Sequence, residues 1–290
     1  MALLSHLNED DLRALCLDAL RKLTFVTSTQ LGDFLRVVGQ IAFERDLPKG
    51  EPGNAGLGLR RLSEEDDDRI TDVLSDFYID GIIRPGPITS RGNTAAMKWP
   101  FFHLTPRGKA IIASPTPSPY DPSGFLGEIR AVPGMDDVVV SYVDESVDGL
   151  RHHRHRSSVI MLGVASERAF TLFLEAVVGS INDKVKSKAA EGHLYEVTIQ
   201  RAFDEFTKRY KAPLIVALKN DKDGKPLAHN FDTYLGSLLI NIKEYRNDAG
   251  HAVTVATSRR VAEAHLGLFP DYVAKVFGLI AWLKTHQIVI

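Results

Sequence analysis

A proline-rich stretch near the middle of the chain limits how this sequence can fold. Residues 114–124 contain four prolines, which stand at positions 115, 117, 119 and 122. Such segments favour an extended, semi-rigid backbone, which is typical of linkers between domains. A chain of 290 residues is also long enough for two domains. The sequence therefore predicts a first domain over residues 1–113, a linker over 114–124 and a second domain over 125–290.

The composition is that of a globular protein and excludes some classes of function. Hydrophobic residues make up 44% of the chain, charged residues make up 25%, and the formal net charge is -2. This charge excludes a uniformly basic nucleic-acid binder, so any such binding needs a local basic patch. The one cysteine, Cys16, falls in an apolar helical pattern. This pattern predicts a core residue, excludes a disulfide scaffold and favours a reducing compartment.

The apolar pattern favours a protein that does not contact a membrane. Residues 1–11 lack the basic-then-apolar order of a signal peptide. The longest apolar run, Val276 to Leu283, is shorter than the roughly 20 residues that a membrane-spanning helix needs. We therefore expect a soluble, cytoplasmic protein.

The first domain shows three helical patterns followed by two strand-like runs. We expect helices over residues 8–23, 29–45 and from 63 to the stop at Gly81, a hairpin of strands 82–88 and 98–104, and a short helix ending near residue 112. This order, with the run from Gly81-Ile82-Ile83 to Leu104-Thr105-Pro106-Arg107-Gly108, resembles a winged-helix module, a relative of the helix-turn-helix. We expect the aromatic residues Trp99, Phe101 and Phe102 to belong to its core rather than to a stacking platform.

The charges of this module argue against tight binding to DNA. Arg84, Arg91 and Lys98 on the hairpin have the charge to contact phosphates. The third helix, however, occupies the recognition position and opens with five carboxylates, residues 64–68, which repel phosphate. We therefore expect at most weak, non-selective binding to DNA, and we favour a protein-contact or dimerisation module.

Nearly all of the second domain has the periodicity of helices. The expected helices cover residues 135–147, about 150–181, 197–210, 229–245 and 258–284. Residues 220–224 resemble the opening of a calcium loop but lack a glutamate at the twelfth position, so they predict a turn. The predicted fold class is mainly α, with a helical bundle after a winged-helix domain that carries a small β-hairpin.

A basic run opens the predicted helix over residues 150–181. It holds three arginines, Arg151, Arg154 and Arg156, interleaved with three histidines. One interpretation is a solvated helix end, and the other is a ridge that binds the backbone of RNA. A zinc site is disfavoured, because no cysteine cluster or carboxylate at ligand spacing accompanies the histidines.

The most distinctive polar residues stand between the last two predicted helices. They are Arg246, Asn247 and His251, within the run Glu244-Tyr245-Arg246-Asn247-Asp248-Ala249-Gly250-His251. Gly250 can end a helix and turn His251 back toward Arg246. This stretch resembles the signature of the HEPN superfamily, an arginine, often followed by a polar residue, and then a histidine after four to six positions. A second formal match, Arg260 and His265, lies inside a continuous helical pattern, and we interpret it as chance.

The resemblance implies a metal-independent endoribonuclease that acts as a homodimer and needs no cofactor. His251 would transfer the proton of the ribose 2′-hydroxyl, Arg246 would hold the phosphate, and Asn247 would orient one of these groups. Many relatives act as toxins of toxin–antitoxin systems or as antiphage defence effectors, which implies a partner such as an antitoxin. The alternative is a non-enzymatic HEPN and winged-helix protein that acts as a DNA- or protein-binding regulator or assembly subunit.

Overall fold

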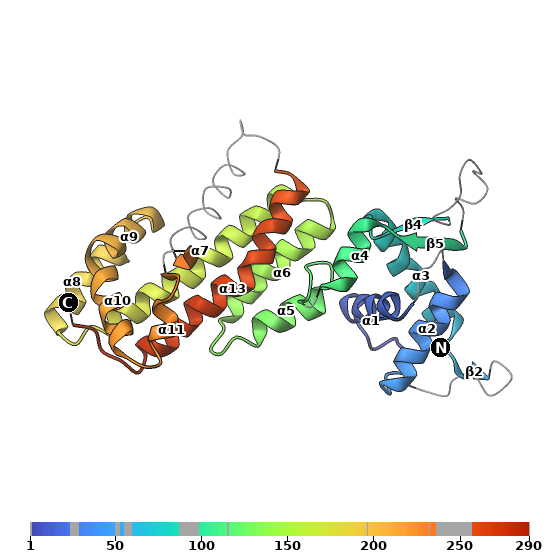
Figure 1. Ribbon diagram of the computed structural model, residues 1–290, viewed down its shortest axis with the longest axis horizontal. Helices are drawn as coiled ribbons and strands as arrows, with labels where there is room; N and C mark the ends of the chain where they lie inside the picture. The colour runs from blue at the N-terminus through green and yellow to red at the C-terminus, as the bar shows by residue number, and fades with distance from the viewer. Residues whose placement is uncertain are drawn as a thin grey trace. The chain divides into compact units, whose positions relative to one another are not determined.

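The chain forms two compact units, Met1–Phe125 (unit 1) and Leu126–Ile290 (unit 2). In this computed structural model the described residues are 2–23, 29–49, 53–54, 60–86, 99–114, 116–195, 197–231, 233–235 and 257–289. Both units are built mainly from helices, and a small antiparallel sheet lies in unit 1 (Figure 1). The predicted fold class, mainly α with a small hairpin, is confirmed.

Unit 1 contains the predicted three helices and hairpin. The helices are α1 (Glu9–Lys22), α2 (Leu31–Glu44) and α3 (Glu64–Ile79), and the hairpin strands are β4 (Ile83–Pro85) and β5 (Phe101–Leu104). A short strand, β1 (Thr29–Gln30), precedes α2 and pairs with β5, so the sheet order is β1-β5-β4. Helix α4 (Pro106–Ala113) follows, and β2 (Gly53–Asn54) pairs separately with β3 (Arg60–Arg61).

The core of unit 1 lies between the three helices and one face of the sheet. Phe102 of β5 is fully buried and packs edge-on against Phe34 of α2, with ring centroids 5.8 Å apart. Cys16 is also fully buried, as predicted, and this burial raises the pKa of its thiol, which therefore stays neutral. The prediction that Trp99 and Phe101 are core residues is wrong, because 43% and 39% of them are exposed. Phe101 alternates with Phe102 along β5, so its side chain points to the opposite face of the sheet.

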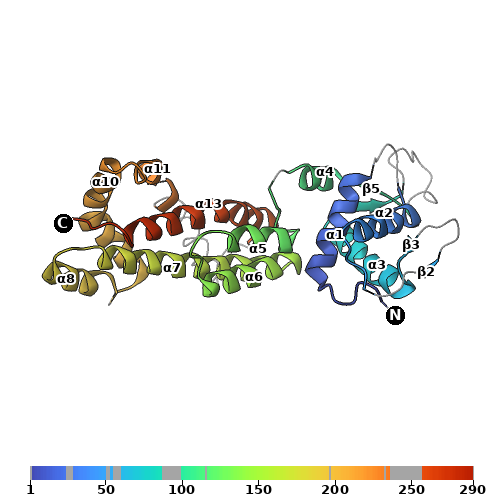
Figure 2. The ribbon, with the colours of Figure 1, turned by 90° about the horizontal axis from the view of Figure 1, so that it is seen from below.

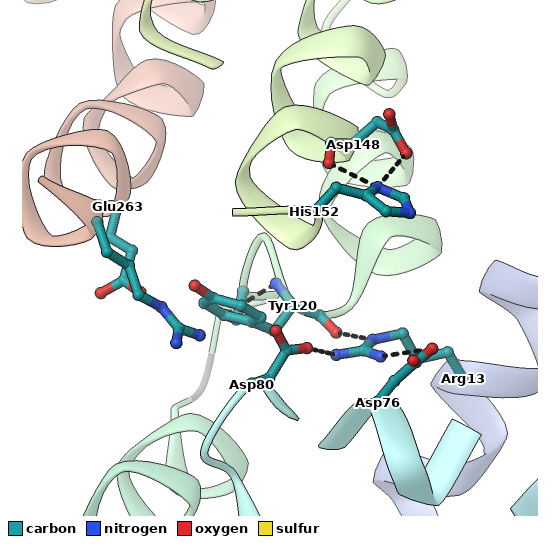
Figure 3. A network of polar contacts seen from close by, with 9 residues as sticks. Arg13, Asp76, Asp80, Tyr120, Asp148, His152 and Glu263 are labelled. Atoms are coloured by element: carbon teal, nitrogen blue, oxygen red, sulfur yellow. Dashed lines mark hydrogen bonds and ion pairs between the residues drawn. The ribbon is translucent and has the colours of Figure 1, made fainter. Parts of the chain in front are cut away.

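The predicted linker, residues 114–124, is not a free extended segment over its whole length. Tyr120 and Asp121 are buried, and helix α5 (Pro122–Arg130) already begins at the fourth proline. The buried Arg13 of α1 holds this segment, because its Nε donates a 2.8 Å hydrogen bond to the carbonyl of Tyr120 (Figure 3). The same guanidinium donates to the buried carboxylate of Asp80. Residues 116–123 thus belong to unit 1.

Three long helices form the centre of unit 2: α6 (Asp137–Arg151), α7 (His155–Gly179) and α13 (Arg259–Leu283). Helix α6 runs antiparallel to α7, since Arg168 pairs with Asp136 and Ser146 bonds to Ser158. Helices α7 and α13 lie side by side and run parallel (Figures 1 and 2). The hydroxyl of Tyr272 donates to the carbonyl of Ser166 near their middle, and Ile288 pairs with Ile181 just beyond their ends.

Shorter helices occupy the chain between α7 and α13. They are α8 (Lys184–Leu194), α9 (Ile199–Glu205), a π-helical turn (Phe206–Tyr210), α10 (Lys211–Asn220) and α11 (Lys225–Ala228). Residues 221–224 form a turn, as predicted, in which Asp221 accepts hydrogen bonds from Gly224 and from the indole of Trp282. The predicted helix over 229–245 lies largely outside the described residues.

Helices α7 and α13 are also long and apolar enough to cross a membrane, by length and composition alone. Their most apolar stretches are each 56% buried within the structure. Core helices of bundles have the same properties, so this observation is a weak indication of a membrane.

Candidate nucleic-acid interface

The predicted catalytic residues, Arg246, Asn247 and His251, lie outside the described residues. The structure describes the chain on either side of them. Before them, Phe231 and Leu235 are buried, and the ring of Tyr234 lies 5.7 Å from Nζ of Lys275 on α13. After them, the description resumes at Thr257, and Ser258 caps the first turn of α13 by accepting a hydrogen bond from the backbone of Val261. In the sequence, six positions separate His251 from Thr257, which lies just before α13.

The basic run is a turn between two helices rather than the start of one helix. Helix α6 ends at Arg151, and α7 begins at His155. His153 between them has a φ of 57°, in the left-handed region that non-glycine residues rarely adopt. The backbone N–H of Arg154 donates to the carbonyl of Gly149 over 2.7 Å and closes the turn. The prediction of one continuous helix over about residues 150–181 is thus wrong.

Two small side chains and a glycine allow α6 and α7 to approach closely at this turn. The buried hydroxyl of Ser146 donates a 2.8 Å hydrogen bond to the carbonyl of Ser158. A Cβ atom on Gly149 would lie 3.0 Å from the backbone nitrogen of Ser158. Such contacts are tighter than normal van der Waals distances, so an alanine at position 149 would push the backbone of Ser158 away by a few tenths of an ångström.

Replacing Gly149 by alanine should therefore lower the free energy of unfolding of unit 2 by about 1–3 kcal/mol. Helix propensity alone would favour alanine by about 1 kcal/mol, so a loss isolates the steric effect. The matched control is Gly267→Ala in α13, where an added Cβ meets nothing within 4 Å. The free energy of unfolding of this variant should rise by about 0.5–1 kcal/mol. Urea denaturation followed by circular dichroism tests the pair, and equal shifts for both variants would contradict the steric account.

The structure places the three predicted RNA-binding arginines at one end of the bundle. Arg151 ends α6 and is half-buried, whereas Arg154 and Arg156 flank the start of α7 and are exposed. Carboxylates stand beside them, because Asp144, Glu145 and Asp148 line a pocket of about 420 Å³ together with Arg154. His152 Nδ1 lies 2.9 Å from a carboxylate oxygen of Asp148 (Figure 3). The turn is therefore cationic along its tip and acidic along its α6 side.

His155 shows that this turn lies next to the first turn of α13. The pKa of His155 is lowered, chiefly by burial and to a smaller extent by the nearby positive charges of His153 and Arg259. The negative charge of Glu263 partly offsets this effect. Arg259 in turn donates to Glu263 over 3.0 Å. Arg259 and Glu263 could not be predicted from the sequence, because only the parallel packing of α7 and α13 brings them to the basic turn. The second formal match to the motif, Arg260 and His265, lies within the continuous helix α13. Its two side chains do not form one site, because Arg260 is exposed whereas His265 is buried.

In unit 1, residues 2–4 cover the first turn of α3. The buried carboxylate of Asp66 accepts hydrogen bonds from the backbone of Leu3 and Leu4, at 2.8 and 2.9 Å, and from Ser63. The neighbouring Glu65 accepts from the backbone of Ala2 at 2.9 Å. Arg69 donates back to the carbonyls of Leu4 and Leu7. Two of the five carboxylates thus hold residues 2–4 over the first turn of α3.

Asp66→Asn should destabilise unit 1 by about 1.5–3 kcal/mol at pH 7, because the bonds to the carboxylate are charge-assisted. Burial alone would raise the pKa of Asp66, but the bonds from Ser63, Leu4 and Leu3 outweigh it and lower the pKa. A lowered pKa stabilises the fold above the unfolded value of about 3.9, and this contribution is lost as the pH falls further. Urea denaturation should therefore show a difference between wild type and variant that shrinks below pH 4.

The control for this change is Asp68→Asn, on the same helix and exposed. It should shift stability by less than about 0.5 kcal/mol. A difference between Asp66→Asn and wild type that stays constant down to pH 2 would contradict the assigned role of the carboxylate.

Among the residues that the structure describes, no cluster of three or more histidine, cysteine, aspartate or glutamate side chains has the geometry of a metal site. Comparison with known proteins gave no further guide, because no family model, curated protein or solved structure matches the chain.

Proposed function

We propose that the chain is a metal-independent endoribonuclease of HEPN type that acts as a cytoplasmic homodimer. The sequence motif Arg246-Asn247 with His251 suggests the chemistry. The resemblance also suggests a setting, as a toxin or an antiphage defence effector with a protein partner such as an antitoxin.

The proposal rests on the position of Thr257, which is the first described residue after the motif. Thr257, six positions after His251, leads into the first turn of α13, and this turn lies beside the basic α6–α7 turn. A six-residue connection spans no more than about 22 Å. We infer that Arg154 and Arg156 would hold the RNA backbone on which His251 would act.

In the proposed reaction the nucleophile belongs to the substrate. Neutral His251 accepts the proton of a ribose 2′-hydroxyl, and the 2′-oxygen attacks the adjacent phosphorus. The bond from phosphorus to the 5′-oxygen breaks, and this oxygen leaves as a hydroxyl after taking up a proton. Arg246 offsets the charge that grows on the phosphate oxygens in the transition state, and Asn247 orients the phosphate or the imidazole. The products are a 2′,3′-cyclic phosphate and a 5′-hydroxyl.

Incubation of the purified full-length protein with RNA in excess chelator tests this proposal. Both a structured and a single-stranded RNA are needed, because the preferred target is set by contacts beyond the motif. Cleavage that persists in chelator supports the proposal. Absence of cleavage of both RNAs, also after any bound partner has been removed, favours the non-enzymatic regulator or assembly subunit instead.

A further inference from the structure

One face of the small sheet in unit 1 is not covered by the helices among the described residues. Figure 1 shows α1, α2 and α3 on one side of β4 and β5. The strand pairs place Phe101 opposite Gln30, and His103 opposite Arg84. Residues paired in this way share a face of the sheet. Phe101, Gln30 and Arg84 are exposed, and His103 is half-buried.

This face combines an exposed aromatic ring with polar side chains. Phe101 is 39% exposed although it is a large apolar residue in a strand. Trp99, two residues earlier, is 43% exposed, but its ring rests on that of Phe102, with centroids 5.9 Å apart. Because Phe102 points to the opposite side of the sheet, Trp99 does not belong to this face. Because Gln30, Arg84 and His103 surround Phe101, the described residues of this face form no continuous apolar area of the kind typical of a protein-docking patch.

The charge of this face is positive. Arg84 makes no ion pair with any other described residue. It is a diagonal neighbour of Phe101 across β4 and β5, and such pairs are about 7–8 Å apart, within reach of a long side chain. None of the four residues on the face is acidic, and the ring of His103 is held by a 2.6 Å hydrogen bond to the carbonyl of Gly86.

We propose that this sheet face is a binding platform for single-stranded nucleic acid. Phe101 stacks on one base, and Arg84 contacts the phosphate next to it. Stacking on aromatic side chains with nearby cations is how proteins bind unpaired strands, because every base offers a flat face. A duplex hides these faces, so the platform discriminates against it. The inference does not rest on the proposed ribonuclease activity, since it concerns binding by unit 1.

Fluorescence anisotropy with the full-length protein tests the platform. The probes are a labelled ten-nucleotide oligouridylate, the matching oligothymidylate and a DNA duplex of the same length, each checked on a gel for integrity after the measurement. We expect both single strands, or the RNA alone, to bind more tightly than the duplex. Phe101→Ala should weaken binding about 5- to 150-fold, the range equivalent to stacking of one base. Arg84→Gln should weaken binding at low salt and reduce its salt dependence.

Three variants separate stacking from other causes. Phe101→Trp should retain binding, whereas Phe101→Leu, which is apolar but not aromatic, should lose it. Tyr78→Ala removes an aromatic residue of α3 that is 51% exposed, and it should bind as the wild type does. Normal binding by Phe101→Leu would overturn the platform and indicate an apolar contact, as for a protein partner. The platform would also be overturned if Phe101→Ala bound each of the three probes as tightly as wild type does.

Discussion

Replacing His251 by alanine is expected to slow RNA cleavage by about 10²–10⁴-fold, the usual contribution of a positioned proton-transfer group. Arg246→Ala should likewise remove measurable cleavage, because no other group would offset the transition-state charge at the same place. Loss of either side chain should cost only about 1 kcal/mol of stability, a typical effect of a single substitution. Cleavage by wild type should also fall at low pH, since a histidine that is charged cannot accept a proton.

The matched controls are exposed residues far from the motif in sequence. His6→Ala removes an exposed histidine of unit 1, and Arg209→Ala removes an arginine that is 45% exposed and paired with Glu205. Both should cleave as wild type does. If His251→Ala and Arg246→Ala also cleave at the wild-type rate, the activity resides elsewhere or in a contaminant, and the proposal is wrong.

Arg13→Met should destabilise unit 1 by about 3–5 kcal/mol, the usual loss when one partner of a buried ion pair is removed. Arg13 is 1% exposed, and it bonds to Asp80, whose side chain is 4% exposed, and to the carbonyl of Tyr120. Its guanidinium also lies 4.6 Å from the ring centroid of Phe77. Methionine fills a similar volume but takes the positive charge away from a buried carboxylate, so the loss is electrostatic rather than a cavity effect.

Tryptophan fluorescence can follow this effect in unit 1 alone. The chain has two tryptophans, Trp99 and Trp282, so a Trp282→Phe background leaves a reporter only in unit 1. The control Arg45→Met breaks an exposed pair with Asp18 and should cost less than about 1 kcal/mol. Adding Asp80→Leu to Arg13→Met should restore part of the loss, because two apolar groups need no counterion. If the loss of stability in the double variant equals the sum of the losses in Arg13→Met and Asp80→Leu, the two charges are not directly coupled.

Most helices follow from periodicity and capping signals in the sequence. The first helix was expected over residues 8–23 and spans Glu9–Lys22, where Asn8 caps it by accepting from the backbone of Asp11. The last was expected over 258–284 and spans Arg259–Leu283. Local signals suffice for these helices because caps and apolar stripes are properties of neighbouring residues.

The break at residues 152–154 does not follow from local signals, because no glycine or proline stands there. It depends on close contact between Gly149 and Ser158 and on the left-handed backbone of His153, which only the folded pair of helices imposes. The packing of residues 116–121 against unit 1 cannot be predicted from local sequence either, because the partner of Tyr120 is Arg13, which is distant in the sequence. The exposure of Phe101 can be predicted from the sequence, because neighbouring residues of a strand point to opposite faces and Phe102 belongs to the core.

The candidate catalytic residues rest on the sequence motif, and the structure adds their surroundings. It describes the basic turn, the acidic side chains next to it and the first turn of α13, with Arg259 and Glu263. No periodicity or spacing in the sequence connects residues 151–156 with residues 259–263. Their proximity comes from the parallel packing of two long helices.

The most direct test of the ribonuclease proposal is the chemical nature of the products. A single-stranded RNA of defined sequence is incubated with full-length protein in excess chelator, the cut is mapped, and the fragments are weighed by mass spectrometry. The proposal predicts a 2′,3′-cyclic phosphate on one fragment and a 5′-hydroxyl on the other. It also predicts that an otherwise identical strand with a single 2′-deoxynucleotide at the cut resists cleavage there. Fragments that end in a 3′-hydroxyl and a 5′-phosphate, or equal cleavage of the two strands, would contradict it.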